Sequence, residues 1–225
     1  MNQLTLFPLD FVEDDFTPDD YETPDHVAEA ISKLLLPSDK KILEPFAGSG
    51  QIAKFMPTNR FTDCFEIKGS RVADGKINAP KARWLQADFF DLDFTSLPSK
   101  YYYDLIVTNP PFSLCIKAIR RSLSLLNNNK ESRLLFLMPI DWYCSKRVSK
   151  EWEELNAHIH HIYPIKGRID YLKNGERMSK QQKFINGVPQ FKADGSPVMN
   201  SGRQVYDAVF DIRLGSDRAI TTFLV

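Results

Sequence analysis

Apolar positions in this chain form short runs that alternate with segments of helical spacing, and this alternation predicts the order of its elements. Runs of strand length predict strands at 41–44, 61–65, 84–87, 103–108, 133–138, 158–163 and 206–214. Helical spacing or a turn signal predicts helices at 25–36, 51–55, 114–126 and 149–156. Strands separated by helices favour an α/β fold with a mostly parallel sheet covered on both faces.

Three parts of the 225-residue chain differ in composition. Residues 1–20 are acidic, contain proline and lack periodicity, so we predict a loose N-terminal arm. Residues 21–225 are long enough for one well-packed domain. Within that domain, residues 172–204 interrupt the alternation with Gly, Asn, Lys and Pro. This segment is too long for an ordinary connection, so we predict an insertion that is functional or partly disordered.

The formal net charge is zero, but the charges are unevenly distributed. Residues 1–30 contain nine acids and no Lys or Arg, whereas residues 166–203 contain eight Lys and Arg against three acids. A basic segment of this kind predicts contact with nucleic acid, and a solvated polar loop is the alternative that charge alone leaves open.

Several classes of protein are disfavoured by composition. No apolar run approaches the roughly 20 residues that span a bilayer, and no secretory signal precedes the domain, so we expect a cytoplasmic protein. The three cysteines lie at scattered positions, Cys64, Cys115 and Cys144. Neither their spacing nor the strand positions of His158, His160 and His161 suit a metal, so we expect no metal site.

A glycine-containing turn follows the first predicted strand, with the sequence Glu-Pro-Phe-Ala-Gly-Ser-Gly at 44–50. Glycines allow close approach of a ligand, as in nucleotide-binding turns. A phosphate-binding P-loop is disfavoured because Gln51 stands where lysine is needed. A dinucleotide fingerprint is formally present through Gly48, Gly50 and Ala53. S-adenosylmethionine is favoured because Glu44 would repel a pyrophosphate but attract a cationic methionine group.

Polar side chains follow four of the predicted strands. Glu44, Glu66, Asp88 and Asn109 each stand at a strand end. Open α/β sheets bind ligands at the carboxyl ends of their strands, so we expect these side chains to share one site. Glu66 would accept hydrogen bonds from ribose hydroxyls, and Asp88 from an adenine amine, with Phe89 against the ring.

The four residues Asn109, Pro110, Pro111 and Phe112 follow the fourth predicted strand. An amide, two rigid prolines and an aromatic ring form a stiff polar pocket with a flat apolar side, which suits a planar group carrying an amine. A rigid turn capped by the asparagine is the alternative interpretation.

The two motifs together resemble a known family. Glu-Pro-Phe-Ala-Gly-Ser-Gly at 44–50 followed by Asn-Pro-Pro-Phe at 109–112 is similar to amino-group DNA methyltransferases of the adenine-N6 type, and Tyr-Glu-Thr-Pro at 21–24 resembles their N-terminal cofactor motif. The resemblance covers about residues 20–170 and implies a Rossmann-like, seven-stranded, mostly parallel sheet with an antiparallel last strand. It implies S-adenosylmethionine as cofactor and a catalytic domain at 21–225. The cofactor-binding residues it implies are Tyr21, Thr23, Pro24, Glu44, Phe46, Gly48, Gly50, Glu66, Asp88 and Phe89.

The resemblance also implies a mechanism. The Asn109 side-chain oxygen and the Pro110 carbonyl would accept the two N–H bonds of the target amine, while Pro111 stiffens the loop and Phe112 stacks on the base. A base in duplex DNA would have to be flipped out of the helix, at a cost of a few kcal/mol.

The substrate is less well defined than the chemistry. Residues 166–171 resemble a stretch of small phage-type adenine methyltransferases, where Arg168 would touch phosphate or base, or pair near Asp170. Trp142 and Tyr143 would line the base pocket or belong to the core. The alternatives are N-methylation of RNA or of a protein glutamine, and a non-catalytic nucleic-acid-binding module. We expect a monomer. The sequence does not say whether a restriction enzyme accompanies this chain.

Overall fold

The computed structural model describes residues 21–94, 102–144, 157–173, 175–185, 187–200, 206–215 and 220–221. The predicted N-terminal arm at 1–20 and the predicted helix at 149–156 lie outside the described residues, as do the side chain of Tyr143 and residue Arg203.

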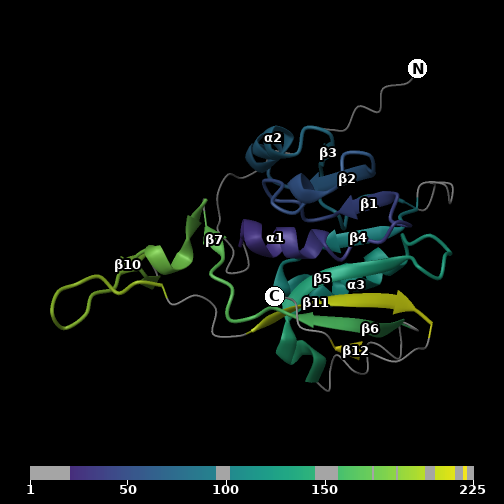
Figure 1. Ribbon diagram of the computed structural model, residues 1–225. Coiled ribbons are helices and arrows are strands. Elements are labelled where there is room, and N and C mark those ends of the chain that lie inside the picture. Colours follow the sequence, from purple (N-terminus) through teal and green to yellow (C-terminus); the bar gives the residue numbers. More distant parts are fainter. Residues whose placement is uncertain are drawn as a thin grey trace.

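One sheet forms the centre of the molecule (Figure 1), with the strand order β12-β6-β11-β5-β4-β1-β2-β3. Its strands are β1 Lys41–Glu44, β2 Phe61–Glu66, β3 Arg83–Gln86, β4 Leu105–Thr108, β5 Arg133–Pro139, β6 Ala157–Pro164, β11 Asp207–Leu214 and β12 Ile220–Thr221. Neighbours pair in parallel except at β11, which is antiparallel to both β5 and β6. The predicted seven-stranded, mostly parallel sheet is confirmed.

The sheet differs from the expectation in one detail. The short strand β12 joins the outer edge of β6 through Ile220 and Thr221, so β11 is the antiparallel strand but not the last one in the chain. A two-residue strand has too few positions to show a periodic pattern, and for this reason the sequence did not predict it.

Among the described residues, three α-helices accompany the sheet: α1 Asp25–Ser32, α2 Gly69–Asn78 and α3 Cys115–Leu123. Helix α1 begins after Pro24 as predicted but ends four residues early. The predicted helix at 51–55 is wrong: only a 3-10 helix, Ala53–Phe55, forms there. Pro57 follows closely and cannot continue a helix, since it lacks a backbone N–H.

Helix α2 was not predicted, and its packing explains the glycine turn. A side chain at Gly75 would overlap the ring of Trp84 on β3, so the helix can approach the sheet only because Gly75 has none. The same ring lies 3.2 Å from the position that a Cβ at Gly50 would take, and Gly50 has a φ of 85°. Gly50 therefore serves the turn and its packing against Trp84.

The insertion between β6 and β11 projects from the sheet as an arm, residues 172–200 (Figure 1). Two antiparallel ribbons build it, one from β7 Leu172–Lys173 and β8 Glu176–Arg177, the other from β9 Phe184–Ile185 and β10 Val188–Pro189. At its root, the Glu22 and Leu172 backbones exchange hydrogen bonds of 3.0 and 3.1 Å.

Candidate active site

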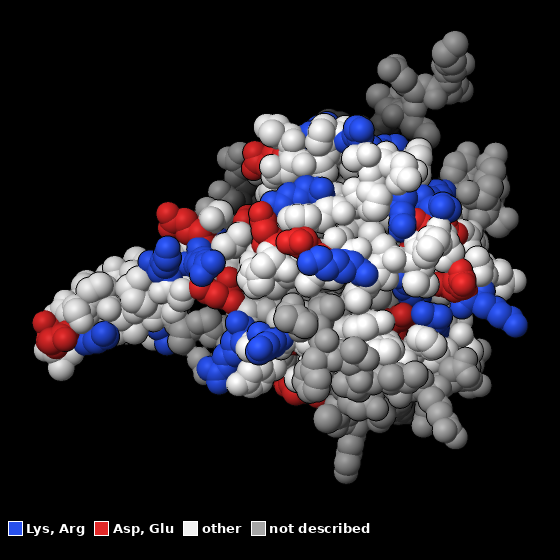
Figure 2. Space-filling view, in the orientation of Figure 1, with Lys and Arg blue, Asp and Glu red and all other residues white. Residues whose placement is uncertain are grey.

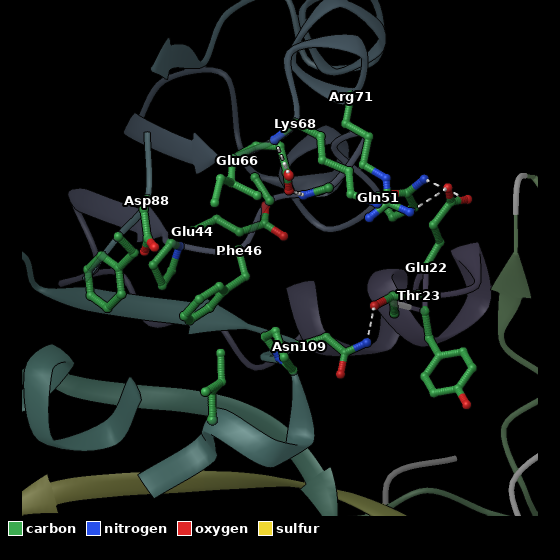
Figure 3. Close-up of a pocket in the computed structure, with 18 of the residues that line it drawn as sticks. Glu22, Thr23, Glu44, Phe46, Gln51, Glu66, Lys68, Arg71, Asp88 and Asn109 are labelled. Carbon is green, nitrogen blue, oxygen red and sulfur yellow. Dashed lines mark hydrogen bonds and ion pairs between the residues drawn. The ribbon is translucent and has the colours of Figure 1, made fainter. Parts of the chain in front are cut away.

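A cavity of about 310 Å³ lies at the carboxyl ends of β1, β2, β3 and β4 (Figure 3). The wall brings together most of the predicted site residues: Tyr21, Thr23, Glu44, Phe46, Gly48, Glu66, Asp88, Phe89, Asn109 and Pro111. The volume is within the range of about 300–1,000 Å³ that is usual for small-molecule sites. The strand-end residues, although far apart in sequence, share one cavity because the carboxyl ends of parallel strands meet at one edge of the sheet.

Glu44 is the last residue of β1 and is 2% exposed. Burial raises the pKa of its carboxyl group well above the usual value, and the neighbouring Glu66 carboxylate raises it further against an opposing backbone hydrogen bond from Ala53. Among the described residues, its Oε2 atom has no hydrogen-bond partner. A buried acid of this kind is costly to ionise unless a cation lies beside it. The geometry thus favours a positively charged ligand.

Glu66 ends β2 and fixes the glycine turn. Its Oε2 atom accepts a hydrogen bond of 2.8 Å from the Gly48 N–H, and its Oε1 atom accepts one of 2.8 Å from the Lys68 N–H. The turn is also bonded to β2 by the Ala47 N–H, which donates to the Phe65 carbonyl at 2.9 Å. These bonds hold the carboxylate on the cavity wall, and a carboxylate oxygen can accept more than one donor.

Asp88 follows β3, and aromatic residues lie around it. The Asp88 Oδ1 atom accepts a hydrogen bond of 2.8 Å from the Phe90 N–H, which closes a local turn. Phe89 is 1% exposed and meets Phe46 edge-on, with ring centroids 5.5 Å apart. Phe46, Phe89 and Phe90, with their rings tilted against one another, form an apolar side of the cavity beside Asp88.

Asn109 follows β4, where its side-chain amide faces two different environments (Figure 3). Its Nδ2 group donates a hydrogen bond of 3.1 Å to the Thr23 hydroxyl. Its Oδ1 atom is buried and, within the part of the chain that the structure describes, has no hydrogen-bond partner. Asn109 and Glu44 line the same cavity, and each has one buried side-chain oxygen without a partner among the described residues.

Six of the predicted site residues do not line this cavity: Pro24, Gly50, Pro110, Phe112, Trp142 and Arg168. Phe112 is buried against Tyr171, with ring centroids 6.4 Å apart. Trp142 is half-buried against the main core. Arg168 is exposed, with its guanidinium carbon 5.5 Å from the centroid of the Tyr206 ring. Asp170 accepts from the backbone N–H and the hydroxyl of Ser179.

Two basic residues, Lys68 and Arg71, line the cavity and were missed by sequence reasoning. Arg71 lies on α2, and its guanidinium is 3.8 Å from the Glu22 carboxylate. Gln51 also donates to that carboxylate, at 3.5 Å. The only sequence signal was a Lys and an Arg three residues apart after a strand, and recognising it required the helix that was not predicted.

The described residues contain no cluster of three or more His, Cys, Asp or Glu that could bind a metal. Nor do they contain a helix with the length and apolar composition needed to cross a membrane.

Comparison with protein-family models gave no match, and comparison of the sequence with curated proteins gave none either. Solved structures do resemble the chain. A proposed RNA methyltransferase from Pyrococcus horikoshii matches with a TM-score of 0.60 and 12% identity over 87% of this chain and 88% of that one. The modification subunit of a proposed type I restriction enzyme from Vibrio vulnificus matches with a TM-score of 0.54 and 14% identity over 86% of this chain.

A third structure, Methanocaldococcus jannaschii Trm5 in complex with adenosine, matches with a TM-score of 0.54 and 13% identity over 88% of this chain. The chain spans only about half of two of these proteins, 44% of the Vibrio subunit and 51% of Trm5. With the strand order described above, these likenesses show that the chain has the class I methyltransferase fold.

Proposed function

We propose that this protein transfers a methyl group from S-adenosylmethionine to the N6 amine of adenine in DNA. The observation that carries the proposal is the pairing of two buried, unused acceptors in one cavity: Glu44 Oε2 for a cationic cofactor and Asn109 Oδ1 for an amine. Within the described residues, both atoms lack a protein partner. Other buried side-chain atoms of the described residues also lack a partner, but these two belong to residues of the cavity wall, where a ligand could satisfy them.

The chemistry of the cavity wall fits the proposed cofactor. Glu44 would face the cationic methionine part, because a neighbouring positive charge offsets the cost of ionising a buried acid. Glu66 would accept the ribose hydroxyls and Asp88 the adenine amine, with the aromatic side of the cavity against the adenine ring. When bound, the cofactor would supply a methyl group on a positively charged sulfur.

The cations of the wall fit the methionine part of the same molecule, beside Glu44. Lys68 and Arg71 lie on the cavity wall and are suited to the carboxylate of the methionine group. An arrangement of Glu44 with these two cations would bind a zwitterionic amino-acid group at both of its charges. A pyrophosphate would instead meet the buried acid, which argues against a dinucleotide.

Asn109 would hold the target amine. The lone pair of an exocyclic amine is delocalised into the ring, and this makes the nitrogen a poor nucleophile. Acceptance of an N–H bond by Asn109 Oδ1 would orient the nitrogen and favour the tetrahedral geometry in which its lone pair is available. The resemblance assigns the second N–H bond to the carbonyl of Pro110, the next residue in the chain. Pro110 and Pro111 restrict the loop that carries these acceptors.

The arm supports a nucleic-acid substrate over a protein glutamine. Its described residues carry more basic than acidic side chains (Figure 2): Lys173, Arg177, Lys180, Lys183 and Lys192 against Glu176 and Asp194. Phe184 and Phe191 are 57% and 60% exposed on the same arm. Positive charge interleaved with exposed aromatic rings suits a phosphate backbone with accessible bases. The root of the arm is bonded to Glu22, so the arm begins beside the cavity.

Methylation of RNA is a second candidate function. The Pyrococcus protein and Trm5 share this fold, and the first is described as acting on RNA. The amine-binding residues would be the same, because an RNA adenine presents the same exocyclic group.

The proposal is tested by incubating the protein with methyl-labelled cofactor and, separately, with duplex DNA, structured RNA and a mixture of proteins. Label in DNA that elutes as N6-methyl-2′-deoxyadenosine after nucleoside digestion is the expected result, with an Asn109→Ala variant as the inactive control. Label in RNA alone would overturn the DNA assignment. Absence of label in all three, from a protein that binds S-adenosylhomocysteine, would leave a binding module and overturn the enzymatic function.

A further inference from the structure

Thr23 lies against the side-chain amide of Asn109, the group that would hold the target amine in the proposed function. It is 4% exposed, and its Oγ1 atom lies 3.1 Å from Asn109 Nδ2, a contact between residues 86 positions apart in the sequence. Thr23 also lines the cavity (Figure 3). The resemblance to methyltransferases implies that Thr23 binds the cofactor, whereas this hydrogen bond points to a second role.

The two ends of an asparagine side chain have nearly the same shape but opposite hydrogen-bonding roles. Because Asn109 uses its NH₂ group on Thr23, its oxygen remains for another donor, and that oxygen is buried without a partner among the described residues. In the reverse orientation the NH₂ group would face the amine of the substrate, and two donors would oppose each other. The orientation of this amide therefore decides whether an amine can be held.

Thr23 itself is held firmly on both sides. On one side, Glu22 exchanges two backbone hydrogen bonds with Leu172, at 3.0 and 3.1 Å. On the other side, Pro24 directly precedes α1, whose Val27 and Ile31 are 1% exposed in the core. Threonine is also branched at Cβ, which limits its side-chain rotamers. The hydroxyl thus occupies a defined position from which it can orient Asn109.

We propose that Thr23 is a positioning residue, whose hydroxyl accepts the Asn109 NH₂ group and so directs Asn109 Oδ1 toward the amine of the substrate. The inference rests on the proposed function, since it concerns the residue that would hold the amine. It predicts that loss of the Thr23 hydroxyl lowers the rate of methyl transfer without weakening the binding of the cofactor. A cofactor-binding role for Thr23 predicts the opposite pattern.

The test compares Thr23→Val, which keeps the shape and removes the hydroxyl, with Thr23→Ser, which keeps the hydroxyl. Thr23→Val should lower kcat on the order of 10- to 100-fold, the size expected when a reacting group is misplaced. The Kd for S-adenosylhomocysteine by calorimetry should stay within about twofold, because Glu44, Glu66 and Asp88, to which the proposed function assigns the cofactor, are unchanged. Thr23→Ser should restore most of the activity. Thermal unfolding of both variants checks that they fold.

A second readout does not depend on activity. In a protein labelled with ¹⁵N at asparagine, the side-chain NH₂ protons of Asn109 should exchange slowly with water, since one of them is bonded to a buried hydroxyl. Thr23→Val should speed this exchange and shift the resonances, and Thr23→Ser should not.

Three outcomes would overturn the inference: an unchanged kcat in Thr23→Val, a raised Kd for S-adenosylhomocysteine with kcat intact, or Asn109 resonances that do not respond. Failure of the proposed function gives a different result. The wild-type protein would then methylate none of the substrates, while the Asn109 resonances would still report whether Thr23 orients the amide.

Discussion

The cavity and the arm differ in the burial of their side chains and in how much of the chain contributes to them. The cavity assembles side chains from many parts of the chain, buries them and fixes them with backbone hydrogen bonds such as those to Glu66. The arm is one continuous segment, 172–200, whose charged and apolar side chains are mostly exposed. An ionised side chain costs more free energy in the cavity than on the arm, because water solvates the exposed charges of the arm and not the buried ones of the cavity. Changes in the cavity should therefore affect reaction and cofactor affinity, and changes on the arm should affect substrate affinity.

The two regions meet at one short segment. Glu22 bonds the root of the arm through its backbone, while its carboxylate lies 3.8 Å from Arg71 on the cavity wall. Thr23, the next residue, bonds Asn109. Glu22 and Thr23 thus connect the arm directly to the cavity wall.

The largest effect is expected at Asn109. Asn109→Asp keeps the size of the side chain and replaces the NH₂ group that bonds Thr23 with a second oxygen. We expect kcat to fall by about 10²–10³-fold, as for loss of one preorganised hydrogen-bonding group in a transition state. Single-turnover measurements with labelled cofactor give the rate, and calorimetry gives the cofactor Kd as a control. A variant with wild-type kcat would remove Asn109 from the mechanism.

The next effect is expected at Glu44, where function and stability should change in opposite directions. Glu44→Gln removes the acid without changing its size, so binding of the cationic cofactor should weaken by roughly 10-fold or more, while the ligand-free protein gains stability at pH 7. Calorimetry with S-adenosylmethionine and unfolding in urea measure the two quantities. If the variant lost stability and kept its affinity for S-adenosylmethionine, a dinucleotide would again be the favoured ligand of the glycine-containing turn.

The pH dependence of stability follows from the same carboxyl group. Its pKa is raised in the folded state, so its proton is held more tightly there than in the unfolded chain. The free energy of unfolding should therefore fall as the pH rises above the ordinary value of 4.5 toward the raised value. Glu44→Gln should flatten this part of the profile. Binding of the cofactor should release a proton in that range, which calorimetry in buffers of different ionisation enthalpy detects.

The smallest effects are expected on the arm. Lys183→Gln with Lys192→Gln should weaken DNA binding several-fold and reduce the slope of log K against log salt by about 2, since each lysine would neutralise about one phosphate. The kcat at saturating DNA should not change. Fluorescence anisotropy over a salt series measures the slope, and Lys33→Gln with Lys76→Gln, exposed lysines of the main domain, serves as the control. An equal loss in the control pair would mean that charge alone, and not the arm, matters.

Strands and strand-end residues were the parts of this protein that sequence could predict. Apolar runs such as 133–138 and 103–108 are local signals, and the seven strands they predict are all present, with ends shifted by at most two residues. Because parallel strands end at one edge, Glu44, Glu66, Asp88 and Asn109 could be expected in one site before any contact was known.

Helix α2 shows why the remainder could not be predicted. It contains Gly69 and Gly75, residues unfavourable to helices, and buries only Val72 and Gly75. It packs through Gly75 against Trp84, a residue of β3 that the local sequence of the helix does not reveal. Without that helix, Arg71 could not be assigned to the cavity. The same reasoning applies to Phe112, whose packing against Tyr171 depends on a distant part of the chain.

The sequence by itself determined the α/β class and the positions of the strands along the chain. It also identified the acids and the amide at the strand ends. These features depend on local hydrophobic periodicity and on motif spacing. Tertiary structure decided which polar atoms are buried and which of them lack a hydrogen-bond partner among the described residues. Two buried oxygens, on Glu44 and Asn109, have no partner in the described part of the chain, and Asn109 is hydrogen-bonded to Thr23. These features arise only when segments far apart in the chain are packed together, since burial and partner choice are properties of the folded molecule.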